Sequence, residues 1–172
     1  MLGLSDEAVA STRLPIQIVS CGVPCLLVPI ATRRDVDEAV LDRAAFSAFL
    51  GKPQKPADCV FFFSAEPAAD EATAYSRMFA PTLGISEDPA TGGASGPLGC
   101  YLVRHGVVTA DQAAAMLSLQ GVKMGRPSHI YISIGVEHGE IASVRVGGEA
   151  VLVGEGFLCV KQHSADRRDR RE

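Results

Sequence analysis

The sequence has no excess of positive charge and no long uninterrupted apolar run, and both absences narrow the possible functions. Its 172 residues carry a formal net charge of −4, so nothing attracts the chain as a whole to nucleic acid or to an anionic membrane. The longest apolar run, Ile18–Ala31, contains two prolines and a glycine and is shorter than the roughly 20 residues of a membrane-spanning helix. We therefore expect neither nucleic acid nor membrane as a partner.

A secretory leader and a metal-binding pattern are also missing. The N-terminal residues MLGLSDEAVASTR lack a basic segment followed by an apolar core, which predicts a cytoplasmic location. The five cysteines include no Cys-x-x-Cys pair, and in apolar stretches a free thiol behaves as a small hydrophobic group. The four histidines are scattered along the chain. We therefore expect structural thiols and no metal site.

Strand-like and helix-like segments alternate irregularly along the chain, without the β–α–β repeat of a doubly wound sheet. Expected helices are a short one capped by Ser5, an amphipathic one over 32–51, and one over 110–120. Expected strands lie near 16–20, 24–30, 58–66 and 74–82, followed by a meander over 128–160 that turns at His138-Gly139 and Gly147-Gly148. The pattern predicts one α+β domain, residues 1–160, with a curved, mostly antiparallel or mixed sheet wrapped on one or two helices. Residues 161–172 are expected to form a charged, frayed tail.

The segment SEDPATGGASGPLGCYLVRHG, residues 86–106, departs from ordinary core patterning. Two acids and a proline lead into small residues, and residues 97–103 are then almost entirely apolar. A helix of that composition must be enclosed by protein, and its first four amide groups have no partner within the helix. Because these amides and the helix dipole favour negative charge, the segment predicts a pocket for a small anion.

The candidate site residues all lie at the start of this helix. They are Asp88 as the acid–base group, and Thr91, Gly92, Gly93, Ala94 and Ser95 as the binding residues. Gly92, Gly93 and Gly96 would let a ligand approach the backbone closely. The alternative is a structural turn in which Thr91 or Ser95 caps the helix and Asp88 bonds nearby amides. A phosphate loop is excluded, because no lysine follows the glycines at the required spacing.

The charged residues Arg77, Glu87 and Asp88 near this segment each allow two interpretations. Asp88 precedes a proline and is therefore extended. In an extended segment neighbouring side chains point to opposite sides, so only one of Glu87 and Asp88 can face the pocket. Arg77 either pairs with a substrate carboxylate or forms a salt bridge with Glu87 or another acid.

Three segments together resemble a known family. YSRMFAPTLGISEDPATGGASG, residues 75–96, resembles the signature of the PhzF-like phenazine-biosynthesis family, which is related in fold to diaminopimelate epimerase. PIQIVSCGVPCLLVPI, and LQGVKMGRPSHIYISI followed by VRVGGEAVLVGEGFL, agree with that family in order and spacing. All three match its second, C-terminal half. The resemblance implies a barrel-like sheet around a central apolar helix that begins near Ser95.

The resemblance also implies an activity. Members of the family are isomerases or epimerases that move a proton on a small carboxylate-bearing substrate, without metal or organic cofactor. Asp88 matches the active-site aspartate, while Thr91, Gly92 and Gly93 match the anion cradle. Gly93 replaces the serine of the usual EDPATGS pattern. The family's first half normally supplies a glutamate, a histidine and a second helix N-terminus.

Three hypotheses remain open from the sequence. The chain is one lobe of an isomerase, completed by a separately encoded lobe or by a second copy in a homodimer. Alternatively, it is an inactive module that binds a small acid or a protein partner. The third hypothesis is a truncated relic without a specific role.

Overall fold

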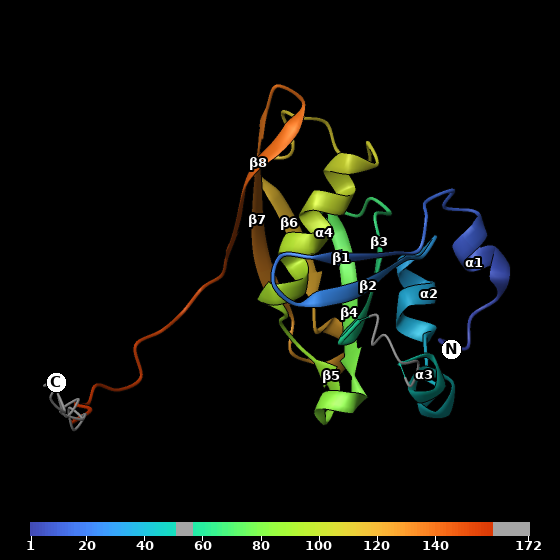
Figure 1. Ribbon diagram of the computed structural model, residues 1–172, viewed down its shortest axis with the longest axis horizontal. Coiled ribbons are helices and arrows are strands. Elements are labelled where there is room, and N and C mark those ends of the chain that lie inside the picture. The colour runs from blue at the N-terminus through green and yellow to red at the C-terminus, as the bar shows by residue number, and fades with distance from the viewer. Residues whose placement is uncertain (51–56, 160–172) are drawn as a thin grey trace, which may run out of the picture.

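The computed structural model describes residues 1–50 and 57–159, which form an α+β fold around one curled mixed sheet (Figure 1). The strands are β1 (Gln17–Ser20), β2 (Pro24–Pro29), β3 (Cys59–Ser64), β4 (Ala74–Ala80), β5 (Ile85–Asp88), β6 (Met116–Gln120), β7 (Ser128–Glu137) and β8 (Glu140–Gly147). Their order is β1-β2-β3-β4-β6-β7-β8, with β5 paired to β4. The β2–β3 and β4–β6 pairs are parallel, and the others are antiparallel. The expected α+β class and the curved mixed sheet are confirmed.

Helices cover both faces of the sheet. They are α1 (Asp6–Ala10), α2 (Arg33–Glu38), α3 (Arg43–Leu50) and α4 (Gly92–Arg104), together with short 3₁₀ turns at Pro81–Leu83 and Val122–Met124. Ser5 caps α1 as expected, because its hydroxyl accepts from the Ala8 amide at 3.3 Å. All six residues of β3 are buried. Phe61 packs on the α4 side and Phe62 on the side of α2 and α3, so covering on both faces explains the unbroken apolar run.

Helix α4 lies unusually close to β7 and β8, and glycine makes this possible. A Cβ atom added at Gly99 would lie 2.5 Å from Ile132 Cγ2, and one at Gly96 would lie 3.1 Å from Val144 Cγ1. Both positions therefore serve the packing of α4 on the sheet. The expectation that Gly96 opens the backbone to a ligand is wrong, because a sheet side chain fills that space.

Arg77 joins α2 to the segment that leads into α4. Its guanidinium forms two hydrogen bonds to Glu87, of 2.8 and 2.9 Å, and also donates to the carbonyls of Val36, Asp37 and Ala39. The side chain is buried, with 7% exposure. This confirms the salt bridge and shows that the guanidinium is bonded to groups of the protein.

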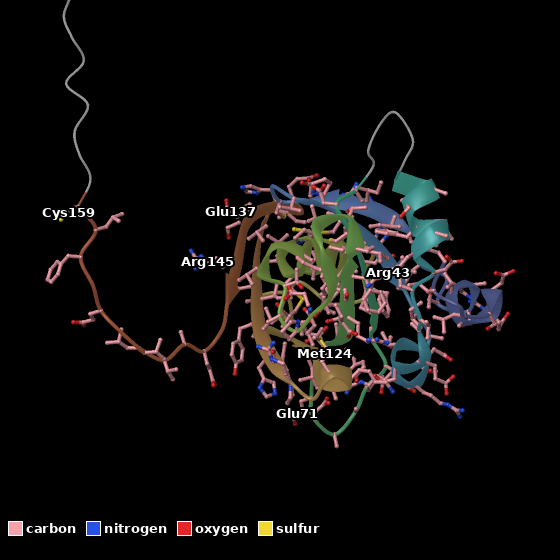
Figure 2. The ribbon with its side chains drawn as sticks, turned by 90° about the horizontal axis from the view of Figure 1, so that it is seen from below. Arg43, Glu71, Met124, Glu137, Arg145 and Cys159 are labelled. Atoms are coloured by element: carbon pink, nitrogen blue, oxygen red, sulfur yellow. The ribbon has the colours of Figure 1, made fainter. Side chains whose placement is uncertain are left out.

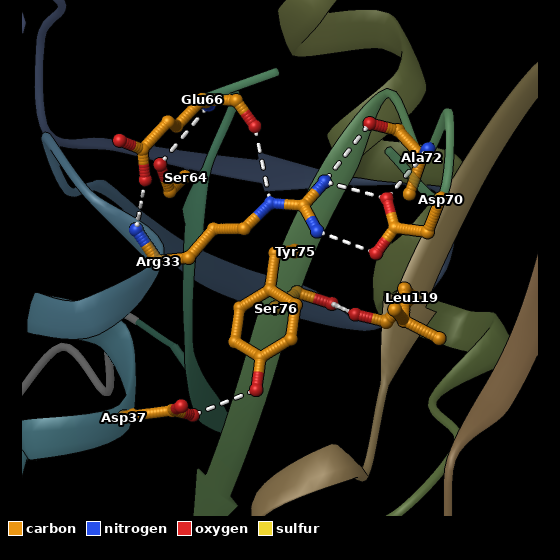
Figure 3. Close-up of polar contacts among 9 residues, drawn as sticks. All are labelled: Arg33, Asp37, Ser64, Glu66, Asp70, Ala72, Tyr75, Ser76 and Leu119. Carbon is orange, nitrogen blue, oxygen red and sulfur yellow. Dashed lines mark hydrogen bonds and ion pairs between the residues drawn. The ribbon is translucent and has the colours of Figure 1, made fainter. Parts of the chain in front are cut away.

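Arg33 makes a second connection between α2 and the sheet (Figure 3). Its guanidinium forms two hydrogen bonds to Asp70, of 2.6 and 3.0 Å, and donates to the carbonyls of Glu66 and Ala72. The hydrogen bonds from Arg33 lower the pKa of the Asp70 carboxyl. Tyr75 lies beneath the guanidinium, 5.4 Å from ring centre to Cζ. Together these contacts hold the start of α2 against the 65–75 connection.

The single helix expected over 32–51 is wrong, because residues 39–42 interrupt it between α2 and α3. The amides of Val40 and Asp42 donate to the carbonyls of Leu2 and Met1 at 2.9 and 2.8 Å. At the end of α2, Arg77 donates to the carbonyls of Val36 and Ala39. Val40 is 70% exposed, whereas Phe46 is fully buried. Long-range hydrogen bonds here override local helix propensity.

The helix expected over 110–120 is also wrong. Residues 116–120 form β6, which runs parallel to β4 and antiparallel to β7, and residues 110–114 form turns. The alanine-rich composition favours a helix locally. Pairing on both edges and burial of the strand favour the sheet, and tertiary context decides.

Residues 148–159 follow β8 as an extended segment, which we call the arm (Figure 1). It leads away from the sheet, and the last strand expected for the meander does not form within residues 148–159. The arm's large apolar side chains are 81–105% exposed: Val151, Leu152, Val153, Phe157 and Leu158. The whole tail expected over 161–172 lies outside the described residues, as does residue 51 of the expected helix.

The packing of α4 gives a direct test of the role of Gly99. Gly99→Ala should lower the free energy of unfolding by about 1–3 kcal/mol, because overpacking against Ile132 exceeds the gain in helix propensity. Gly93→Ala is the matched control, since no atom lies within 4 Å of a Cβ there; it should be neutral or stabilise by up to about 1 kcal/mol. Urea denaturation followed by circular dichroism measures both. Equal effects of the two substitutions would contradict the packing assignment.

Candidate functional site

Helix α4 begins at Gly92, ahead of the start expected near Ser95. The Thr91 carbonyl accepts the amides of Ala94 and Ser95, both at 3.1 Å, and the Ser95 hydroxyl at 2.8 Å. Ala94 and Ser95 are fully buried. Their side chains and amides are thus used inside the helix, and neither Thr91 nor Ser95 caps α4 through its side chain.

The helix tip keeps two open donors. The amides of Gly92 and Gly93 have no hydrogen-bond partner among residues 1–50 and 57–159. A Cβ atom added at Gly93 would meet open space. One added at Gly92 would lie 3.9 Å from Val146 Cγ1, which is an ordinary van der Waals contact. These amides lie at the positive end of the helix dipole and are suited to an anion.

Gln120, at the end of β6, braces the turn before α4. Its fully buried amide donates to the Asp88 carbonyl at 2.7 Å and to the Thr91 hydroxyl at 2.9 Å, and its oxygen accepts the Thr91 amide at 3.1 Å. One side chain therefore fixes both ends of the 88–91 turn. Sequence reasoning missed Gln120, because 29 residues separate it from Thr91 and the segment was expected to be helical.

Asp88 is the acid nearest the helix tip. Its Oδ2 atom accepts the Thr91 hydroxyl at 2.7 Å, and Glu87 instead pairs with Arg77. The hydroxyl hydrogen must point to Asp88, because Gln120 already donates to the Thr91 oxygen. The other carboxylate oxygen, Oδ1, has no hydrogen-bond partner within the described ranges. The half-buried carboxylate is thus held on one side and available on the other.

A hollow of about 500 Å³ adjoins the helix tip. Its lining comprises Ala90, Gly92, Pro127, Ser128, His129, Ile130, Val146, Gly147, Gly148 and Glu149. Of the six predicted site residues, Gly92 lines this hollow, and the other five, Asp88 and Thr91 among them, do not. The polar lining residues Ser128, His129 and Glu149 were not predicted, because the ends of β7 and β8 carry no local motif.

The described part of the chain contains neither a cluster of metal-ligating side chains nor a membrane-spanning helix. No group of three His, Cys, Asp or Glu side chains is arranged there as metal ligands. Within the same residues, no helix is both long and apolar enough to span a bilayer.

Comparison with known families places the chain. The PhzC-PhzF family, described as phenazine biosynthesis-like protein, matches residues 1–156. The chain belongs to this family. It is similar to the uncharacterized isomerase YddE of Escherichia coli O157:H7, with 31% identity over 86% of this chain and 49% of that protein. An uncharacterized isomerase of Mesorhizobium japonicum is 30% identical over 92% of this chain and 53% of that protein.

A shorter match reaches a relative with a named reaction. The trans-2,3-dihydro-3-hydroxyanthranilate isomerase of Pseudomonas fluorescens is 42% identical over 49% of this chain and 30% of that protein. The chain therefore spans about half the length, or less, of the curated relatives it matches.

Solved structures of the family share the fold. A PhzF-family protein of Bacillus anthracis superposes with a TM-score of 0.67 at 21% identity, over 86% of this chain and 49% of that one. A predicted epimerase of Pseudomonas aeruginosa gives 0.58 at 26% identity, over 90% and 50%.

The brace formed by Gln120 can be tested by substitution. Gln120→Leu should lower the free energy of unfolding by about 1–3 kcal/mol, because it leaves partly buried groups of the turn unpaired. It should also speed hydrogen exchange at the Thr91 amide, which donates to the Gln120 oxygen, measured by NMR. Gln112→Leu is the control, since that side chain is exposed and bonds only Thr109 nearby. Unchanged exchange in Gln120→Leu would show that the turn does not depend on the brace.

Proposed function

We propose that this chain is one lobe of a PhzF-like isomerase, with a diaminopimelate-epimerase-like arrangement around α4. In this proposal the tip of α4 binds the carboxylate of a small substrate, and Asp88 transfers a proton without any cofactor. A second lobe completes the site. Family membership and relatives named isomerase support the reaction type.

The observation that carries the proposal is the pair of open amides at Gly92 and Gly93. Eight residues of α4 are buried, so its tip is held rigidly by the surrounding sheet. The hollow beside Gly92 has room for a small molecule, and a carboxylate there would accept the free amides. The Thr91 hydroxyl is not available for this purpose, because it bonds Asp88.

Asp88 is suited to proton transfer through one oxygen. The Thr91 hydroxyl orients the carboxylate through Oδ2, and Gln120 in turn orients that hydroxyl, which leaves Oδ1 to accept or donate a proton. Moving a proton between two positions of a substrate usually requires an acid and a base with different pKa values. The proposal assigns the second group to the other lobe, as the family resemblance implies.

The arm supports the presence of a second lobe. Five large apolar side chains with at least 81% exposure follow one another within residues 151–158, and exposed apolar surface of this kind usually marks an interface. The family match extends through residue 156 and so includes most of the arm. A second copy of this chain, or a separate lobe of the same family, would cover it.

A small-acid-binding module is the second candidate function. Two observations favour it: Asp88 does not line the hollow, and Gly93 lacks the hydroxyl that the family pattern usually places there. In this version the amides bind the acid and no proton is transferred.

Exchange of substrate hydrogen with solvent tests the enzymatic proposal. The protein, with trans-2,3-dihydro-3-hydroxyanthranilate as probe in D₂O, should incorporate deuterium into the probe. Asp88→Asn should reduce the rate at least about 100-fold, the usual scale for an acid–base group. Asp111→Asn, at an exposed acid, should leave it unchanged. Binding of the probe without exchange would favour the binding module, and equal exchange in both variants would remove Asp88 from the mechanism.

The role of the arm can be tested by sedimentation. The homodimer version predicts a species of twice the 18.1 kDa chain mass. The double variant Leu152→Ser/Phe157→Ser should shift it to a monomer, whereas Val40→Ser, at an exposed valine outside the arm, should not. A monomer at every concentration would contradict the homodimer.

A further inference from the structure

Two buried thiols take no part in the proposed site. Cys25 on β2 and Cys59 on β3 are paired directly across the parallel strands. They are 1% and 3% exposed, and their sulfur atoms lie 2.9 Å apart. Both belong to the apolar cluster that packs against α4. The position is therefore dry and the two side chains point at each other.

The backbone around the pair suits a covalent bond. Neighbouring strands lie about 4.8 Å apart, within the Cα–Cα range of about 4.4–6.8 Å found for disulfides. A disulfide has an S–S length of about 2.05 Å, so closing the bond needs a movement of less than about 1 Å. Rotation of the two Cα–Cβ bonds can provide it without moving either strand.

The two thiols are chemically unequal. Cys59 donates its hydrogen to the Cys25 sulfur, and this hydrogen bond, together with burial, raises the pKa of Cys59. The same hydrogen bond lowers the pKa of Cys25. The thiolate is the reactive form of cysteine, so Cys25 is the nucleophile of the pair.

We propose that Cys25 and Cys59 are a reversible oxidation site that forms a disulfide between β2 and β3 when the protein meets a hydroperoxide. The Cys25 thiolate attacks the outer peroxide oxygen, which forms an S–O bond, breaks the O–O bond and releases an alcohol or water. The Cys59 sulfur then displaces hydroxide from the resulting sulfenic acid, and a proton from Cys59 completes the water that leaves. Two thiols and one peroxide thus give one disulfide, and a thiol reductant reverses the reaction.

Access to Cys25 comes through the β1–β2 turn. Cys25 follows this turn by two residues, and Val23 within it is 46% exposed. The turn contains Gly22 with a φ of 132°, a conformation that other residues rarely adopt. Local opening of the turn would admit a molecule as small as hydrogen peroxide, which makes the reaction slower than that of an exposed thiol.

The disulfide would anchor the β1–β2 hairpin to the rest of the sheet. The β2–β3 pair is the sheet contact that joins the hairpin to β3, and the bond would link residues 34 positions apart. Closing a loop of that size restricts the unfolded chain and stabilises the fold. The inference does not depend on the proposed isomerase activity.

The other cysteines offer competing reactions. Cys21 and Cys159 are exposed, and Cys159 lies at the far end of the arm (Figure 2). Cys21 lies against α4, 3.7 Å from a Cβ built at Gly96, and near Cys100, whose pKa is raised by burial to about 11. A variant that removes all three, Cys21→Ser/Cys100→Ala/Cys159→Ser, isolates the proposed pair.

The experiment exposes folded protein to hydrogen peroxide, then alkylates the remaining thiols in denaturant and identifies linked peptides by mass spectrometry. The triple variant should form the Cys25–Cys59 link, its melting temperature should rise by roughly 5–10 °C, and dithiothreitol should reverse both changes. Adding Cys59→Ala to the triple variant should abolish the link and the rise.

Two results would overturn the proposal. One is recovery of Cys25 and Cys59 as free thiols in the triple variant after peroxide treatment continued well beyond the time that fully oxidises the exposed Cys21 and Cys159 of the natural sequence. The other is a link that appears only when urea has unfolded the protein, because it would show that the folded state does not permit the reaction.

Discussion

The close contact between α4 and the strands β7 and β8 is the constraint on which the rest of the structure depends. Gly96 and Gly99 allow the helix backbone to approach Val144 and Ile132 more closely than any side chain would permit. The sheet can therefore curl around a helix that is buried on most sides. Burial in turn fixes where the tip of α4 points, and the open amides of Gly92 and Gly93 follow from that position.

Two buried polar side chains, Arg77 and Gln120, give the two acids in front of α4 different surroundings. Arg77 draws Glu87 away to α2 with two hydrogen bonds, while Gln120 holds the backbone of Asp88 on the side of α4. Adjacent residues of an extended strand must point to opposite sides, so each interaction reinforces the other. The division between a structural acid and a candidate catalytic acid thus arises from the strand geometry and from partners far along the chain.

The sequence was enough to predict those parts of the fold that depend on residue composition and on contacts between neighbouring residues. The strand at residues 59–64 follows from its apolar and aromatic composition, the capping by Ser5 from short-range bonding, and the opposite directions of Glu87 and Asp88 from side-chain alternation. The break at Ala39 and the strand ending at Gln120 do not, because hydrogen bonds to Met1, Leu2 and Arg77, and pairing with β4, decide them. The candidate acid and the glycines at the tip were visible in the sequence, but their brace and the hollow beside them arise from distant segments.

The parallel pairing of β6 with β4 has a consequence for how the site comes into being. Gln120 occupies the last register position of that pair, opposite Ser76. Because strand side chains alternate between faces, sliding β6 by one residue would turn Gln120 towards the α2 layer and bring Leu119 to the turn. Correct alignment of two strands from distant parts of the chain is therefore a precondition for an ordered helix tip. The site is assembled by the same event that completes the middle of the sheet, and misaligned chains would lack it from the outset.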